Sequence, residues 1–302
     1  MQNKEKPSIT IGIPVFNEEK NILNLLQDIE CQNLDGFKLD KIIIYSDGST
    51  DKTVSIAKKT HLKKLKVIES KLRLGIATGL NEIIKSSTSD ILLTFDGDIR
   101  IKDEQFIRKL IKPIVFYNTD HTSSAIKDIQ PRNFFERSLS VSMQLKDVLF
   151  SNFKKGNNLY TCHGLARAYS RKFYKSLKFP VSIGNDMYGY LACVSSGHIF
   201  KYVSIASVFY RLPNSFTDHK KQSNRFSQAS SEMLKYFEPE FLERESKINF
   251  PTYVRSFFEA FGLIVTSPFY IITYLLIQSY LKYFSGHTHV GQTWDIARSS
   301  KI

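Results

Sequence analysis

The sequence predicts an α/β fold with a mostly parallel central sheet flanked by helices. The first observation is a set of short apolar runs with the composition of buried strands, at residues 8–16, 41–45, 65–69 and 91–95. The second is the helical spacing of the apolar residues between these runs, such as Ile22, Leu25, Leu26 and Ile29. Strands that alternate with single helices are joined by right-handed crossovers, and their carboxyl ends meet at one edge of the sheet.

The same patterns predict the boundaries of the elements. Asn17 and Thr50 are expected to cap the first two helices, because short polar side chains bind the free N–H groups of a first turn. Further helices are expected at residues 75–84, 102–113 and 133–150, and further strands at 122–131, 158–169 and 198–205. His163 and Gly164 would lie at the tip of the strand 158–169, and residues 218–226 would lie in a loop.

Composition limits the kinds of partner. The 302 residues are 42% hydrophobic and 24% charged, which is ordinary for a globular protein. The net charge is +13, and most of the excess lies after residue 150, which suggests an anionic partner such as a membrane, a phosphorylated substrate or nucleic acid. A solvated basic face without a partner is the alternative. No nucleic-acid recognition motif is present, so nucleic acid is not an expected partner. Three widely spaced cysteines and an N-terminus without an apolar stretch suggest a reducing compartment and no signal peptide.

Acidic side chains follow the predicted strands at the edge where their carboxyl ends meet. Asp96 and Asp98 come directly after the run 91–95, and Asp47 follows the run 41–45. Two carboxylates separated by one small residue can hold a divalent cation, and such a cation can hold a diphosphate. A simple Asp-Gly turn is the alternative for Asp96 and Gly97. No glycine-rich phosphate loop is present, so basic side chains such as Arg73 would have to help bind phosphates.

Four sequence blocks in this order resemble those of glycosyltransferase family 2, which has the GT-A fold: PVFNEE, YSDGSTD, RLGIATGLN and FDGD. The resemblance implies that the first block lines the nucleotide-base pocket of a UDP- or GDP-sugar, through Pro14, Phe16, Asn17 and Glu18. It implies that Asp47 binds the base or ribose. Asp96 would lie near the nucleotide, and Asp98 would be a direct ligand of Mn²⁺ or Mg²⁺. Ile76 replaces a lysine found in many members, so diphosphate contact would fall to Arg73.

The resemblance also implies residues on the acceptor side. Asp186 would be the catalytic base, although the usual Glu-Asp pair is Asn185-Asp186 here. Inversion at the anomeric carbon needs a base that takes the proton of the acceptor hydroxyl. The structural alternative for Asp186 is a helix cap without a catalytic role. The segment QSNRF is similar to a Q-x-x-R-W motif. This comparison implies Gln222 and Arg225 at the diphosphate and Phe226 at the acceptor, where Asn185 is also expected. Gly164 would permit close approach of a substrate, so His163 and Gly164 are expected at the acceptor too, and His219 is a candidate second metal ligand. A hydrogen-bonded structural role is the alternative for His163.

The last quarter of the chain contains an uncharged stretch at residues 260–281. Its length suffices for one membrane crossing, and its tyrosines suit a membrane interface. Pro268 lies near its middle and would either kink one span or divide it into a re-entrant hairpin. A buried core helix is a third alternative.

The sequence therefore predicts four regions: a catalytic domain at 1–230, a helical connector at 231–255, a membrane-associated helix or hairpin at 256–284, and a tail at 285–302. The expected function is inverting, metal-dependent transfer of a sugar from a nucleotide donor to a saccharide or lipid-linked acceptor. The expected location is the cytoplasmic face of a membrane. Two alternatives remain open: a membrane-tethered nucleotide-sugar-binding protein that has lost catalysis, and a sugar-1-phosphate nucleotidyltransferase.

Overall fold

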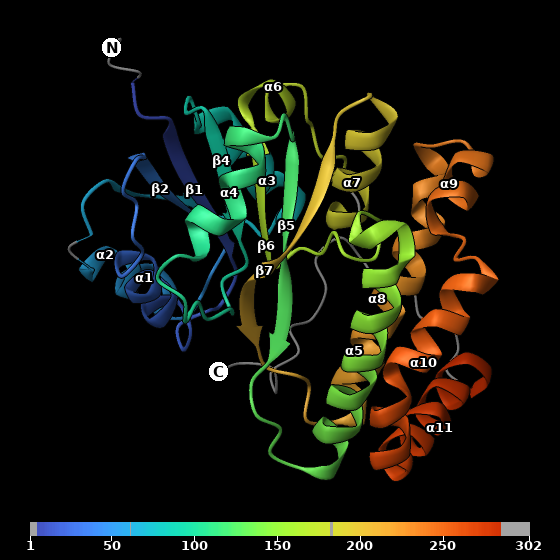
Figure 1. The fold of residues 1–302 in the computed structure, drawn as a ribbon. Coiled ribbons are helices and arrows are strands. Elements are labelled where there is room, and N and C mark those ends of the chain that lie inside the picture. Colours follow the sequence, from blue (N-terminus) through green and yellow to red (C-terminus); the bar gives the residue numbers. More distant parts are fainter. Residues whose placement is uncertain (1–4, 61, 182–183, 285–302) are drawn as a thin grey trace.

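A seven-stranded sheet forms the centre of the protein in the computed structural model, which describes residues 5–60, 62–181 and 184–284. The strand order is β3-β2-β1-β4-β6-β5-β7, and β6 alone is antiparallel to its neighbours (Figure 1). The strands are β1 (Ser8–Val15), β2 (Lys38–Asp47), β3 (Leu65–Ser70), β4 (Ile91–Phe95), β5 (His121–Asp128), β6 (Ala166–Ser170) and β7 (Phe200–Tyr210). The predicted α/β class with a mostly parallel sheet is confirmed.

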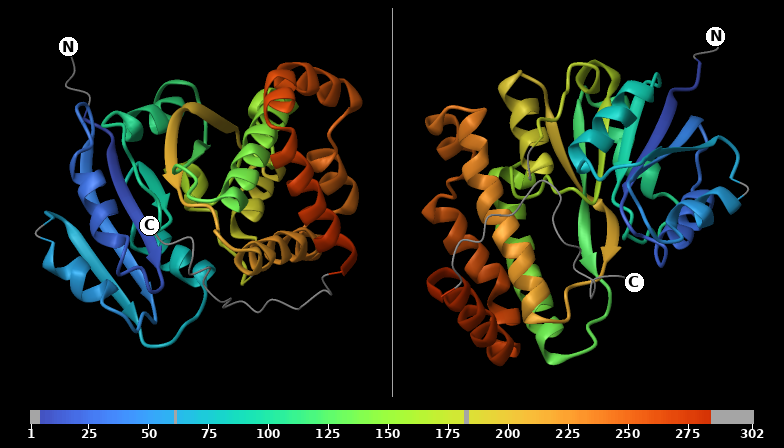
Figure 2. Two further views of the ribbon diagram at one scale, coloured as in Figure 1. Left: turned by 90° about the horizontal axis from the view of Figure 1, so that it is seen from below. Right: turned by 180° about the vertical axis from the view of Figure 1, so that it is seen from behind.

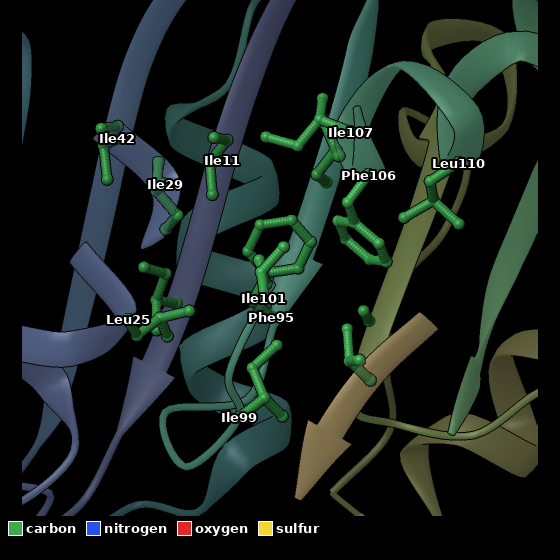
Figure 3. Close-up of a cluster of buried hydrophobic side chains, with 14 of the residues drawn as sticks. Ile11, Leu25, Ile29, Ile42, Phe95, Ile99, Ile101, Phe106, Ile107 and Leu110 are labelled. Atoms are coloured by element: carbon green, nitrogen blue, oxygen red, sulfur yellow. The ribbon is translucent and has the colours of Figure 1, made fainter. Parts of the chain in front are cut away.

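Helices cover both faces of this sheet. They are α1 (Ile22–Glu30), α2 (Thr53–Lys59), α3 (Ile76–Ser86), α4 (Phe106–Phe116), α5 (Phe134–Asn152), α6 (Arg171–Tyr174), α7 (Asn185–Ser195), α8 (Phe216–Glu232), α9 (Pro239–Ser246), α10 (Phe250–Thr266) and α11 (Pro268–Phe284). On one face, α1 and α4 bury Leu25 and Phe106 against Ile11 and Phe95 (Figure 3). On the other face, α3, α6 and α7 pack on the alternate strand residues, whose side chains point away from the first core, such as Leu92. The alternation of side chains along each strand produces these two cores.

Two predicted helix caps are wrong, because Asn17 and Thr50 bind each other instead. The helices begin later, at Ile22 and Thr53. Asn17 has a left-handed backbone with φ of 53°, and its Oδ1 accepts a hydrogen bond from the N–H of Thr50 at 2.8 Å. An asparagine tolerates this conformation better than most residues. The Asn17–Thr50 contact therefore joins the loops that follow β1 and β2.

Two further segments differ from their predicted structure. The predicted strand 158–169 begins only at Ala166, because the side chain of Asn158 closes turns with Phe150, Phe153 and Tyr160. His163 and Gly164 therefore lie in the loop that leads into β6. The predicted loop 218–226 lies inside the helix α8, whose N-terminus is capped by Ser215 accepting from the N–H of Asp218. A hydrophilic helix with few apolar residues gives little periodic signal.

The C-terminal helices α10 and α11 pack on α5, on the side of the molecule away from β3 (Figures 1 and 2). Within the described residues, no single helix has the length and apolar composition needed to cross a membrane. The segments Pro239–Thr266 and Pro268–Tyr283 meet these criteria only as a pair, with a bend of 110° between them. The alternative of a buried core helix is wrong, because Phe258 and Phe269 are 70% and 75% exposed. The predicted tail 285–302 lies outside the described residues.

Candidate active site

Asp47 organises the loop in front of α3 from the carboxyl end of β2. Its Oδ1 accepts from the N–H of Leu74 at 2.7 Å, and its Oδ2 accepts from the N–H of Gly75 at 2.9 Å. The turn after Asp47 requires glycine, because Gly48 has φ of +72° and a Cβ there would lie 2.9 Å from the backbone nitrogen of Arg73. Asp47 therefore fixes the position of the loop that carries Arg73.

The first predicted donor block surrounds the end of β1. The guanidinium of Arg73 lies 3.8 Å from the centre of the Phe16 ring, which is a cation–π contact. Pro14 is buried at the end of β1, where its ring lies near α3 at Gly79. Glu18 is also buried; its Oε2 accepts from the Asn21 side chain and its N–H donates to Thr53. Phe16 and Arg73 thus form a flat, basic surface on loops that Pro14, Asn17 and Glu18 hold in place.

Asp96 and Asp98 flank Gly97, where a larger residue would crowd its neighbours, because a Cβ there would lie 2.9 Å from Glu18 Cγ. Gly164 lies close to this pair, because a Cβ on it would lie 3.5 Å from Asp96 Oδ2. Burial, followed by the charge of Asp98, raises the pKa of Asp96 to about 7. Burial also raises the pKa of Asp98, and the nearby Arg225 opposes this effect. Two crowded carboxylates of this kind suit a hard divalent cation, which would offset their repulsion.

No group of three or more His, Cys, Asp or Glu side chains in residues 5–60, 62–181 and 184–284 is arranged to hold a metal ion. The pair Asp96 and Asp98 nevertheless has the donor chemistry that Mn²⁺ or Mg²⁺ prefers. The further ligands of such an ion would have to come from water or from substrate phosphates, as is usual for Mg²⁺ at phosphate sites.

Asp186 and Arg225 lie on two different helices and are both near Asp96 and Asp98. Asp186 lies in the first turn of α7, where its Oδ1 accepts from the N–H of Met187 at 2.9 Å. Arg225 lies on α8; burial lowers its pKa, and the charges of Asp98, Asp96 and Asp186 oppose that effect. The structure therefore brings together the four predicted residues Asp96, Asp98, Asp186 and Arg225. Their chemical roles stay predictions.

A buried arginine, Arg167 on β6, completes this group and was missed by the sequence argument. It is 1% exposed, and its Nη2 donates to Oδ1 of Asn185 at 2.9 Å. Burial lowers the pKa of Arg167, but the net shift is upward because of its neighbours Tyr169, Cys162, Asp186 and Asp96. Asn185, predicted at the acceptor, is thereby a buried anchor for the start of α7. The signal for Arg167 was a lone charge between small and aromatic residues of a predicted strand.

His163 lies beside this group as a neutral side chain. Its Nε2–H donates to the carbonyl oxygen of Ser124 at 2.6 Å, which leaves Nδ1 as an acceptor. Burial lowers its pKa to about 3, with the Ser124 bond opposing and the charge of Arg167 adding to the shift. His163 therefore has a structural hydrogen bond and one nitrogen that can accept another.

The remaining predicted residues, His219, Gln222 and Phe226, lie on α8. Gln222 lies one helical turn before Arg225, and Phe226 is 67% exposed. The ring of His219 lies 6.1 Å from that of Phe135, and its Nε2 lies 3.4 Å from Nε2 of Gln278. Burial and the nearby Lys146 lower the pKa of His219 to about 4. These neighbours indicate that His219 packs α8 against α5 and α11, and they give no support to a metal-ligand role.

The raised pKa of Asp96 predicts a pH-dependent stability. Its folded-state pKa of about 7 lies above the ordinary value of 3.8, so the folded protein holds this proton more tightly than the unfolded chain. This stabilisation is present below about pH 4 and is lost as the pH rises through about 7. In the absence of divalent metal, the Tm of the wild type should fall relative to that of Asp96→Asn between about pH 5 and about pH 8. Parallel Tm curves in differential scanning fluorimetry would contradict the assignment.

The topology and the carboxylate site define the class of this protein as a GT-A fold protein. The solved structure of the mannosyltransferase PcManGT from Pyrobaculum calidifontis, in complex with GDP-Man and Mn²⁺, has a TM-score of 0.67 and 18% identity, covering 92% of this chain and 85% of that one. Glucosyl-3-phosphoglycerate synthase from Mycobacterium tuberculosis, in complex with Mn²⁺, UDP and phosphoglyceric acid, has a TM-score of 0.57 and 18% identity, covering 76% of this chain and 78% of that one. These likenesses establish the fold.

The chain belongs to glycosyl transferase family 2, whose sequence profile matches residues 10–178, more than half of the chain. A UDP-N-acetylglucosamine–dolichyl-phosphate N-acetylglucosaminyltransferase of Methanococcus voltae is 29% identical over 189 residues, which are 56% of this chain and 72% of that protein. The putative glycosyltransferase EpsE of Bacillus subtilis is 28% identical over 113 residues, 36% of this chain and 38% of that protein. The chain thus matches less than half of EpsE, and 45% of an uncharacterized protein of Methanocaldococcus jannaschii.

Proposed function

We propose that this chain is an inverting glycosyltransferase that uses a UDP- or GDP-sugar. The observation that carries the proposal is the meeting of Asp96, Asp98, Asp186 and Arg225 in one half-buried site at the carboxyl edge of the sheet. Transferase is favoured over sugar-1-phosphate nucleotidyltransferase by the family match. Several relatives and solved structures of similar fold bear the names of glycosyltransferases, including one complex with GDP-Man and Mn²⁺.

The residues suggest a division of roles. Asp98, together with Asp96, would hold Mn²⁺ or Mg²⁺, and the ion would neutralise charge on the diphosphate leaving group. The carboxylate of Asp186 would take the proton of the acceptor hydroxyl as its oxygen bonds to the anomeric carbon. The bond from that carbon to the diphosphate breaks, and its electron pair leaves with the diphosphate. Arg225 would face the diphosphate, and Phe16 with Arg73 would face the nucleotide base or its phosphates.

A panel of nucleotide sugars tests the function. We expect one UDP- or GDP-sugar to bind in isothermal titration with Mn²⁺ and to bind at least about tenfold more weakly with EDTA. Slow hydrolysis of the same donor, detected as released nucleoside diphosphate, should accompany binding. Donor binding without any turnover in the presence of acceptors would favour the alternative of a nucleotide-sugar-binding protein that has lost catalysis. Absence of metal-dependent binding across the panel would contradict the proposal.

We also propose that α10 and α11 hold the protein on the cytoplasmic face of an anionic membrane. The exposed apolar residues of each helix recur at helical spacing, so they share one face: Phe250, Tyr253, Val254, Phe257, Phe258, Phe261 and Val265 on α10, and Phe269, Ile272, Leu275, Leu276, Tyr280 and Tyr283 on α11. Two short helices with a 110° bend suit insertion into the interface better than a crossing. The cysteines of the chain are all unpaired, which suits a reducing compartment.

The membrane proposal predicts that Phe258→Ser together with Phe269→Ser weakens vesicle binding. Both rings are mostly exposed, so their loss removes about 2–3 kcal/mol of apolar transfer free energy each without disturbing the core. Flotation with vesicles that contain about 30% phosphatidylglycerol should show at least about a tenfold loss of binding. The matched control is Phe116→Ser, an equally exposed ring on α4 at 66%. Equal loss in the control, or no binding by the wild type, would contradict the proposal.

A further inference from the structure

A second basic site lies directly after the end of β7. Arg211 is only 7% exposed, and within the described part of the chain its Nε and Nη1 have no hydrogen-bond partner. A buried guanidinium without partners is costly, because it loses its hydration and gains no hydrogen bonds in exchange. The side chain is therefore suited to bind an anionic ligand.

The groups around Arg211 leave it with an excess of positive charge. Burial lowers the pKa of Arg211, the charge of Arg132 lowers it further, and Glu136 opposes both. Glu136 offsets only one of the two positive charges of Arg211 and Arg132. Its Oε2 accepts from the backbone N–H of Arg132, and its Oε1 has no partner among the described residues. These groups lie at the N-terminus of the 19-residue helix α5, where the helix dipole also favours an anion.

The surroundings place this basic site next to both the carboxylates and the apolar helices. The backbone N–H of Arg100 bonds to the carbonyl of Phe209 at 2.8 Å, which ties the end of β7 to the chain just after Asp98. Burial and the charges of Asp128 and Asp98 raise the pKa of Tyr210, the residue before Arg211. On the other side, the ring of Phe134, two residues after Arg132, lies 5.0 Å from that of Tyr270 on α11.

We propose that Arg211 and Arg132 bind the phosphate of a phosphorylated acceptor. The inference rests on the proposed transferase function and adds the chemical class of its acceptor. A phosphomonoester or diphosphate at Arg211 would be held beside the carboxylate site, while the rest of the acceptor extends toward Asp186. A lipid attached to the phosphate would continue along α11, whereas a soluble acceptor would use the phosphate contacts alone.

Three variants test this site: Arg211→Gln, Arg132→Gln and the control Lys112→Gln, which removes one exposed charge from α4. Arg132 is exposed, so its variant should fold even if Arg211→Gln is unstable. The probes are inorganic phosphate in isothermal titration, and glycerol 3-phosphate and phytanyl phosphate in micelles as acceptors. We expect both arginine variants to weaken phosphate binding at least about tenfold, and the control to match the wild type.

Donor binding with Mn²⁺ is measured on the same proteins and should stay unchanged in all three variants. Use of either phosphorylated acceptor by the wild type, with loss in Arg132→Gln, supports the site, and the acceptor that is used identifies a lipid or a soluble source. Phosphate binding that is equal in the wild type and both arginine variants would overturn the inference, and Arg211 would then be half of a buried ion pair. A wild type that binds phosphate but no nucleotide sugar would instead overturn the proposed transferase function.

Discussion

Replacing Asp186 by asparagine is expected to remove most sugar transfer and to leave donor binding unchanged. The amide cannot accept a proton, and a positioned general base typically contributes about 10²–10⁴-fold to the rate. The variant keeps the oxygen that accepts from the N–H of Met187, so the start of α7 should stay folded. We therefore expect kcat to fall by about 10²–10⁴-fold while the Kd for the nucleotide sugar stays within about twofold.

The control for this variant is Asp35→Asn, which changes an exposed carboxylate in the loop before β2. It should keep the kcat of the wild type. Transfer retained by Asp186→Asn would exclude this residue as the base, and Asp186 would then serve only in the first turn of α7.

Replacing Asp98 by asparagine is expected to abolish the metal dependence of donor binding. The amide is a weaker ligand for a hard cation than the carboxylate, and the site would lose one of its two carboxylates. In isothermal titration, Mn²⁺ should strengthen nucleotide-sugar binding in the wild type and should have an effect at least about tenfold smaller in Asp98→Asn. The same substitution should lower the pKa of Asp96, because the charge of Asp98 contributes to its rise.

Asp103→Asn is a suitable comparison, since Asp103 lies five residues along the chain and pairs with Lys109 at the surface. It should leave the effect of Mn²⁺ intact. An undiminished metal effect in Asp98→Asn would show that the ion binds elsewhere.

The parts of the fold that could be predicted are those with strong local patterns. The apolar run of β4 ends at Phe95, and the abrupt change to Asp96 is enough to predict carboxylates at the edge of the sheet. The helix α8 gave no such signal: its residues are mostly polar, and only Ala229 is buried. Its role in the site depends on Arg225 reaching carboxylates from two other elements, which is a tertiary arrangement.

The site residues that escaped prediction are those whose partners lie far away in the chain. Arg167 belongs to no periodic pattern, and its partner Asn185 follows 18 residues later, beyond α6. Arg211 similarly depends on Arg132 and Glu136, which follow β5, the strand that pairs with β7. By contrast, the lack of charge in residues 260–281 pointed to an apolar segment, and the structure adds that this segment bends at Pro268 and exposes many of its apolar side chains.

The contact between Arg167 and Asn185 restricts how this chain can evolve. Asn185 supplies an oxygen to the guanidinium of Arg167 and brings no negative charge to it. Introducing an acid at position 185 would create a fourth carboxylate in the pocket and compete for the same cation. An acid at position 185, as in the usual Glu-Asp pair, would therefore alter the charge balance around Arg167 and Asp186.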